Sequence, residues 1–261
     1  MNNREKIEIL QKWIDESKRI VFFSGAGVST DSGIPDFRSQ DGLYNQKYKF
    51  PPEEIISHDF FENNTEEFYR FYKDKMLCLG AKPNIVHEYI ARLEKAGKSL
   101  GVITQNIDGL HLLAGSKHVV ELHGSIHRNY CTKCGKFYSA EYIQKTKGIP
   151  YCECSGLIKP DVVLYGEMLD EKAQRDAIKM IQQADMLVVL GTSLVVYPAA
   201  GFIRYFVGDK LVMINRTATS YDNIADLVIQ ANFKSIFPHL TIHKDIWDGN
   251  PLPLGGGRKS L

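Results

Sequence analysis

The chain has 261 residues, of which 44% are hydrophobic and 24% are charged, as in ordinary globular proteins. This composition excludes collagen-like, coiled-coil and wholly disordered proteins, and the length suits one large α/β domain, with or without a smaller inserted module. The 32 Lys and Arg against 31 Asp and Glu leave a net charge of +1, which argues against electrostatic capture of nucleic acid or of an anionic membrane as the main role.

The N-terminal stretch MNNREKIEIL carries several charges and no apolar run, so it does not resemble a secretion signal, and a cytoplasmic protein is expected. Residues 186–203 are uncharged and just reach the length at which a membrane span must be considered. However, Gly191, Thr192, Ser193 and Pro198 interrupt this stretch. A buried strand, a turn and a helix starting near Pro198 explain it better, so no membrane association is expected.

In chain order, Ile7, Leu10 and Ile14 follow the spacing of an amphipathic helix. The next segment, RIVFFS at residues 19–24, predicts a buried strand ended by a glycine turn. The same reasoning predicts further helices at residues 86–93 and 171–183. Further strands are predicted at residues 100–104, 119–122, 186–190, 211–214 and 227–229. Alternating strands and helices imply a mostly parallel sheet covered on both faces.

Two regions break this alternation. Residues 37–79 are rich in aromatic side chains, with helices predicted around 52–57 and 65–75, and residues 128–158 hold four of the five cysteines. We expect both regions to form a second, smaller lobe. Ligands of open α/β sheets bind at the carboxyl ends of the strands, so the cleft between the lobes is the predicted site. The tail from residue 248 is expected to be rich in turns.

The cysteines predict a metal site. Cys131 and Cys134 form a C-x-x-C pair, and Cys152 and Cys154 form a tighter C-x-C pair; two such pairs resemble a zinc ribbon. Four protein ligands fill a tetrahedron, so the ion should be structural. The alternatives are two disulfides, which a cytoplasmic chain disfavours, or buried thiols. Cys78 stands alone and is interpreted as a core thiol.

The glycine turn Gly25-Ala26-Gly27 after the first strand is typical of close backbone approach to a phosphate. A plain turn is the alternative. A dinucleotide-binding G-x-G-x-x-G pattern needs glycine at position 30, where this chain has Thr30, so an ordinary dehydrogenase is poorly supported.

His123 ends an apolar strand, and imidazole titrates near neutrality, which suits a general base. One of eight histidines can equally be a hydrogen-bonded structural group. Asn106, Asp108 and His111 follow the preceding strand as polar neighbours, with helix capping as their alternative role. The chain has no H-E-x-x-H and no G-x-S-x-G motif, which removes common zinc-protease and serine-hydrolase signals.

Taken together, these segments resemble the sirtuins, the NAD-dependent protein-lysine deacylases, and most of all their bacterial members. The motifs are GAGVSTDSGIPDFRS (25–39), TQNIDGLHLLAG (104–115), ELHGS (121–125), the paired cysteines, GLIKPDVVLYGE (156–167) and GTSLVVYPAA (191–200). The resemblance implies a Rossmann-like NAD-binding domain made of residues 1–36, 80–124 and 158–261. It also implies a small domain with a helical module (37–79) and a zinc-ribbon module (125–157), and one structural zinc on the four paired cysteines.

The resemblance also implies the site residues. NAD would be bound by Ala26, Thr30, Phe37, Arg38, Gln105, Asn106, Ile107, Asp108, His123, Thr192, Ser193, Asn215 and Asn232. An acyl-lysine peptide would be bound by Val162, Val163 and Leu164, through their backbone as an added strand, and by Gly166 and Glu167 beside them. His123, Asn106 and Asp108 would be the catalytic residues.

In the implied reaction the acyl oxygen of the substrate attacks C1′ of the nicotinamide ribose as nicotinamide leaves, so the protein supplies no nucleophile. His123 then removes a proton from a ribose hydroxyl. The products are free lysine, nicotinamide and 2′-O-acyl-ADP-ribose. Sirtuins that prefer succinyl or malonyl groups carry a Tyr-x-x-Arg pair, which is missing from FYRFYKDK at residues 68–75. Acetyl, or a longer uncharged acyl group, is therefore the expected substrate.

Three other functions remain open at this point. The same NAD site could pass ADP-ribose to a protein side chain or to water. The cysteine module, with Lys133, Lys136, Lys145 and Lys147 nearby, could bind nucleic acid, although these lysines are scattered and the net charge of +1 argues against nucleic acid as a partner. A degenerate NAD sensor is the third. No feature of the sequence sets the oligomeric state, and a monomer is favoured.

Overall fold

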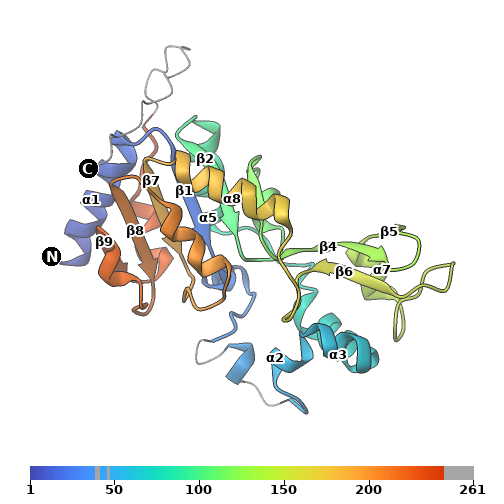
Figure 1. Cartoon of the computed structure of the whole chain (residues 1–261). Coiled ribbons are helices and arrows are strands. Elements are labelled where there is room, and N and C mark those ends of the chain that lie inside the picture. The colour runs from blue at the N-terminus through green and yellow to red at the C-terminus, as the bar shows by residue number, and fades with distance from the viewer. Residues whose placement is uncertain (39–41, 46–47, 244–261) are drawn as a thin grey trace.

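A parallel sheet of six strands forms the larger body of the chain (Figure 1). The computed structural model describes residues 1–38, 42–45 and 48–243, so the tail from residue 248 lies outside the described residues. The strands are β1 (Ile20–Ser24), β2 (Ser99–Thr104), β3 (Val119–Glu121), β7 (Met186–Leu190), β8 (Lys210–Asn215) and β9 (Leu227–Gln230). Their order is β3-β2-β1-β7-β8-β9, and every pair is parallel. The α/β prediction is therefore confirmed.

Side chains of β1 alternate between the two faces of this sheet, as the pleat of a strand requires. Ile20 and Phe22 pack on one face, with the helices α1 (Asn3–Glu16) and α5 (Ile85–Lys95). Val21 and Phe23 pack on the other, with α8 (Glu171–Gln183) and the 3₁₀ helix η4 (Ala199–Tyr205). All five residues of β1 are buried, because helices cover both faces.

The smaller lobe contains an antiparallel sheet of three strands in the order β5-β4-β6. Its elements are β4 (Gly124–Cys131), β5 (Phe137–Tyr138), α7 (Ala140–Lys145), β6 (Ile158–Val162), α2 (Pro52–Ile55), α3 (His58–Asn63), α4 (Thr65–Phe71) and the π-helical turn η3 (Tyr72–Met76). Figure 1 shows β4, β5, β6 and α7 projecting from the larger body, with α2 and α3 beside them. Phe60, Phe68, Ile143 and Ile158 belong to one shared hydrophobic core. The exact domain boundaries stay a prediction.

The helix α3 is one that the sequence analysis did not predict. The predicted helix around residues 52–57 ends at Ile55, and Ser57 starts a new helix by accepting a hydrogen bond from the backbone N–H of Phe60 at 3.2 Å. The predicted helix over 65–75 ends at Phe71, after which the chain widens into η3. The spacing of the aromatic residues indicated helices in this region. It did not indicate where each helix ends, because capping and packing decide the ends.

The remaining helical elements are all short. They are η1 (Ala26–Ser32), η2 (Leu43–Asn45), α6 (Leu110–Leu113), η5 (Asp222–Ile224), η6 (Phe233–Ser235) and η7 (Phe237–His239). The uncharged residues 186–203 form β7, a turn and part of η4, as expected. Within the ranges that the structure describes, no helix has the length and apolar character needed to cross a membrane.

Candidate active site

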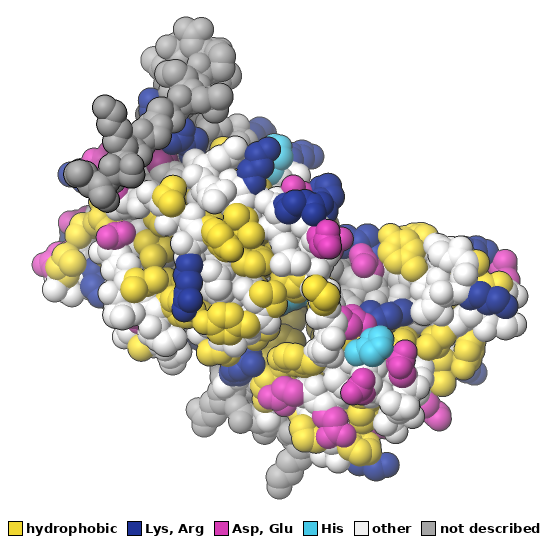
Figure 2. All heavy atoms as spheres, viewed as in Figure 1, with side chains coloured by type: hydrophobic (Ala, Val, Ile, Leu, Met, Phe, Trp, Pro, Cys, Tyr) yellow, Lys and Arg dark blue, Asp and Glu magenta, His cyan; other side chains and the backbone are white. Residues whose placement is uncertain are grey.

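A cavity of about 800 Å³ opens between the carboxyl ends of the large sheet and the smaller lobe. Figure 2 shows hydrophobic side chains gathered along the line where the two bodies meet. The predicted NAD and peptide residues that line this cavity are Ala26, Phe37, Arg38, Gln105, Asn106, Ile107, Asp108, His123, Val162, Val163, Leu164, Gly166, Glu167, Thr192, Ser193 and Asn215. Thr30 and Asn232 are absent from the lining: Thr30 donates its hydroxyl to the carbonyl of Gly27 at 3.0 Å, and Asn232 is exposed. The structure thus gathers residues from seven separate segments at one place.

The glycine turn after β1 is packed against the turn after β7. The N–H of Gly25 donates to the carbonyl of Leu190 at 3.0 Å, and the N–H of Gly27 donates to that of Gly191 at 2.8 Å. A Cβ on Gly25 would lie 2.6 Å from Cβ of Thr192, so a larger residue does not fit. The sheet order reverses between β1 and β7, which is where open α/β sheets bind ligands.

Asn106, Ser29 and Asp108 form a hydrogen-bonded cluster on the cavity wall. The hydroxyl of Ser29 donates to Oδ2 of Asp108 at 2.6 Å and accepts from Nδ2 of Asn106 at 3.1 Å. The other carboxylate oxygen of Asp108 accepts from the N–H of Leu110 at 2.9 Å, at the start of α6. Asp108 therefore closes a turn just before α6, whose N-cap residue is Gly109 and has no side-chain cap, while its second oxygen stays in the cavity cluster.

His123 lies where the chain passes from β3 of the large sheet into β4 of the small one. Its Nδ1 donates to the carbonyl of Gln105 at 2.8 Å. A carbonyl can only accept, so Nδ1 carries the proton and Nε2 is the basic nitrogen of the neutral ring. Burial lowers the pKa of His123, and the hydrogen bond to Gln105 opposes this only in part. The imidazole is therefore neutral and able to accept a proton near pH 7.

Gln105, Thr192 and Asn215 connect the ends of β2, β7 and β8. Nε2 of Gln105 donates to the hydroxyl of Thr192 at 3.1 Å, and the N–H of Thr192 donates to Oδ1 of Asn215 at 2.9 Å. Nδ2 of Asn215 is buried at the cavity and has no hydrogen-bond partner among the described residues. Because an unpaired buried donor is costly, this amide is suited to a ligand oxygen.

The peptide segment, residues 162–167, runs along the cavity after β6. The N–H of Val163 donates to the carbonyl of His123 at 3.0 Å, which ties this segment to the catalytic candidate. Glu167 accepts from the N–H of Leu164 at 2.9 Å, from Nζ of Lys159 at 3.1 Å and from Nδ1 of His58 at 2.9 Å. These partners hold the pKa of Glu167 below its usual value, although burial opposes them. The carboxylate of Glu167 therefore holds the peptide segment in place by hydrogen bonds within the segment and to the residues around it.

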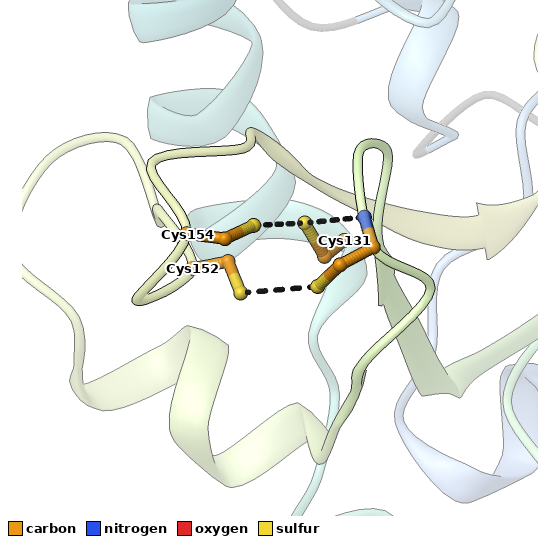
Figure 3. Close-up of side chains that lie close together, drawn as sticks. Cys131, Cys152 and Cys154 are labelled. Carbon is orange, nitrogen blue, oxygen red and sulfur yellow. Dashed lines mark hydrogen bonds between the residues drawn. The ribbon is translucent and has the colours of Figure 1, made fainter.

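The four paired cysteines lie together at the far end of β4, away from the cavity lining. Their sulfur atoms all lie within 4.8 Å of one another. Sγ of Cys131 is 3.4 Å from that of Cys154, and Sγ of Cys134 is 3.6 Å from that of Cys152. Figure 3 shows Cys131, Cys152 and Cys154 turned toward a common point.

These separations exceed a disulfide bond of about 2.05 Å. They are close to the spacing of about 3.8 Å that four sulfurs take around zinc at about 2.3 Å each. The cluster therefore fits one tetrahedral zinc with no position left for water, including the C-x-C half. Cys78 stands apart from this cluster, but it is only half-buried and belongs to none of the three hydrophobic cores, so its interpretation as a core thiol is wrong.

Several lining residues were not singled out in the sequence. Ser29, Tyr44, Lys75 and Arg216 all face the cavity. Ser29 had a usable signal, since it lies within the motif after the glycine turn. Lys75 and Arg216 had no such signal in the sequence, because lysine and arginine are common on any protein surface.

A parallel sheet with a cavity at its switch point, joined to a lobe whose four paired cysteines fit a structural metal, defines a nucleotide-binding α/β protein. Comparison with known proteins makes this specific. The Sir2 family model matches residues 25–198. The chain belongs to the Sir2 family, the sirtuins.

Relatives of known name agree with this assignment. The chain is 58% identical over 229 residues to a protein of Clostridium acetobutylicum named NAD-dependent protein deacetylase, covering 86% of this chain and 94% of that protein. It is 42% identical to a Sir2 structure with a p53 peptide and NAD+, with a TM-score of 0.80, covering 91% and 96% of the two chains. A Sir2 structure with 2′-O-acetyl-ADP-ribose and deacetylated p53 peptide is 41% identical, with a TM-score of 0.78 and coverage of 88% and 96%.

Proposed function

We propose that this chain is an NAD-dependent protein-lysine deacetylase that transfers the acetyl group of acetyl-lysine to ADP-ribose and releases nicotinamide and 2′-O-acetyl-ADP-ribose. The observation that carries the proposal is the position of His123. This neutral imidazole lines the cavity between the polar cluster of Asn106 and Asp108 and the peptide segment. The names and ligands of the Sir2 relatives support the same activity.

NAD fits the residues at the carboxyl edge of the large sheet. The cavity volume of about 800 Å³ lies within the range of cofactor sites. The unpaired amide of Asn215 and the exposed hydroxyl of Ser193 would meet ribose and phosphate oxygens. Asn106 and Asp108 would hold the nicotinamide end. When bound, NAD supplies a ribose carbon made electrophilic by the nicotinamide leaving group.

An acyl-lysine peptide fits beside β6 as an added strand. The strand β6 is at the edge of its sheet, so one side of it is not paired with another strand of that sheet. Among the described residues, no hydrogen bond reaches the carbonyl oxygen of Val163. A peptide N–H could therefore donate to it, and binding through the backbone would read little of the peptide sequence.

In this proposal Nε2 of His123 accepts a proton from a ribose hydroxyl. The hydrogen bond from Nδ1 to Gln105 holds the ring in the required tautomer and orientation. The hydroxyl of Ser29 keeps Asn106 and Asp108 at fixed positions facing the same cavity. General-base assistance of this kind contributes roughly 10²–10⁴-fold to rate.

The zinc would stabilise the smaller lobe and take no part in the reaction, since its four cysteines lie outside the cavity lining. A cytoplasmic location belongs to the same proposal. It is supported by the four paired cysteines, because their sulfur positions fit one zinc and not disulfides, and close cysteine pairs of reducing compartments more often bind metal than form disulfides.

The test is incubation with NAD and an acetyl-lysine peptide, followed by mass spectrometry of both products. His123→Ala should lower the rate by roughly 10²–10⁴-fold and keep its zinc. The exposed His239, which does not line the cavity, provides a control in His239→Ala. Turnover of His123→Ala at the level of wild type would contradict the proposal. NAD consumption without O-acetyl-ADP-ribose would instead favour ADP-ribose transfer.

A further inference from the structure

Two tyrosine hydroxyls meet at the cavity. The hydroxyl oxygens of Tyr44 and Tyr165 are 2.8 Å apart, which is a hydrogen-bond distance. Both side chains line the cavity, although they are far apart in the sequence. Tyr44 belongs to η2, just after the predicted NAD loop, and Tyr165 belongs to the peptide segment. One hydrogen bond therefore joins the two predicted binding elements directly.

The backbone of Tyr165 is held in place by the helical part of the smaller lobe. Its N–H donates to the carbonyl of Ile56 at 3.0 Å, and its carbonyl accepts from the N–H of His58 at 2.9 Å. Ser57, between them, forms a parallel bridge with Tyr165. These bonds fix the position of Tyr165, so its hydroxyl is a well-placed partner for Tyr44.

Tyr44 is in turn bound to the residues predicted to cover NAD. Its N–H donates to the carbonyl of Phe37 at 2.9 Å, and the two rings are 5.3 Å apart between centroids. The guanidinium of Arg38 lies 5.1 Å from the centre of the Tyr44 ring. Any shift of Tyr44 would therefore move the contacts of both residues.

The series of contacts continues to the nucleotide side of the cavity. Asp36 precedes Phe37, and its carboxylate pairs with Arg216 at 3.1 Å. Arg216 follows β8 next to Asn215. Neighbouring contacts thus run from the peptide segment, through Tyr165 and Tyr44, to the edge where the adenosine part of NAD is expected.

We propose that the Tyr44–Tyr165 hydrogen bond couples the two ligands, so that a bound acyl-lysine peptide strengthens NAD binding and NAD strengthens peptide binding. This inference rests on the proposed function. A peptide strand on residues 162–164 would hold the segment that leads into Tyr165, and Tyr165 would then favour the position of Tyr44 that places Phe37 and Arg38 over NAD. Coupling between binding sites is reciprocal, so both affinities change by the same factor. Tyr44 and Tyr165 are positioning residues in this scheme.

The experiment measures the dissociation constant of ADP-ribose, a fragment of NAD that cannot react, with and without saturating acetyl-lysine peptide. Titration calorimetry is applied to wild type, Tyr165→Phe, Tyr44→Phe and the double variant. Phenylalanine keeps the ring, and with it the contact to Phe37, and removes only the hydroxyl. Tyr205→Phe is the matched control, because Tyr205 is exposed and does not line the cavity.

In wild type and in Tyr205→Phe, the peptide should tighten ADP-ribose binding by about two- to tenfold, the range expected of one hydrogen bond. In each variant lacking a hydroxyl this factor should fall close to one, while zinc content and melting temperature stay unchanged. The double variant should lose no more coupling than either single variant, since all three remove the same bond.

Coupling that persists at the wild-type level in both single variants overturns the inference, as does a wild type that binds both ligands independently. Either result leaves the proposed function standing. A wild type that binds neither ADP-ribose nor the peptide contradicts the proposed function itself, so the two failures are distinguishable.

Discussion

The carbonyl oxygen of Asp161 lies 1.9 Å from the position that a Cβ on Gly124 would occupy. Gly124 follows His123 directly and has a φ of +74°, which an L side chain rarely adopts. At this point β4 and β6 approach each other so closely that only glycine fits. The backbone that carries His123 is therefore positioned by a contact between two strands of the smaller lobe.

For this reason, Gly124→Ala should lower the turnover of acetyl-lysine peptide more than a substitution at a glycine whose Cβ position is open. The added methyl must push β4 and β6 apart and displace His123. Gly148→Ala is the control, because Gly148 has a similar φ of +67° but nothing within 4 Å of its Cβ position. We expect Gly148→Ala to cost about 1–2 kcal/mol of stability and to keep full turnover. Equal turnover in the two variants would show that the close approach does not control His123.

The pH dependence of kcat/KM should reflect the lowered pKa of His123. Burial favours the neutral imidazole, so the pKa lies below the ordinary value of 6.5. The neutral form is the base, and its population falls only as pH drops through this lowered pKa. Activity should thus persist below pH 6.5 and decline at more acid pH. The measurement is a pH profile of kcat/KM with an acetyl-lysine peptide whose flanking residues carry no charge. An inflection on the acid side of this profile at a pH above 6.5 would count against His123 as the base.

Zinc content should depend on the paired cysteines and not on the fifth. Cys152→Ser removes one of four ligands, so we expect purified protein with almost no zinc and a lower melting temperature, because Cys152 also packs in the core of the smaller lobe. Cys78→Ser should retain one zinc per chain. Elemental analysis by mass spectrometry gives the metal content. Zinc retained at one per chain in Cys152→Ser would contradict the four-cysteine site.

Acetyl peptide should be turned over faster than succinyl peptide, by at least about tenfold, because burying a poorly paired carboxylate costs more than ~1.4 kcal/mol. Tyr69 and Tyr72 do not line the cavity; both are buried in the small-lobe core, where the hydroxyl of Tyr69 donates to the carbonyl of Ile158. Paired initial rates on the two peptides measure the preference, and a faster succinyl reaction would refute it.

Lys75 is one of the cations of the cavity lining, together with Arg38 and Arg216, and is the one to vary in that comparison. It lines the cavity and pairs with Asp74 at 3.0 Å. Lys75→Ala should remove residual succinyl turnover and leave acetyl turnover unchanged, since only the succinyl group offers a carboxylate to the ammonium group.

Much of the large sheet could be predicted from local sequence. The helix at residues 171–183 was predicted with the bounds that α8 has, and each predicted strand matches an observed one within about two residues at its ends. The helical part of the smaller lobe was harder, because its aromatic residues face a core shared with a distant sheet, and α3 depends on a cap at Ser57 that no periodicity reveals.

By itself, the sequence determined the α/β class, the family resemblance and the types of residue in the cavity and the metal cluster, because hydrophobic period and motif spacing are local properties of the chain. Only the tertiary structure decided which atoms meet. Ser29 with Asp108, Gly124 against Asp161 and Tyr44 with Tyr165 are contacts between residues distant in sequence. Such pairings arise when two sheets and their connecting loops pack together, and no local pattern encodes the resulting distances.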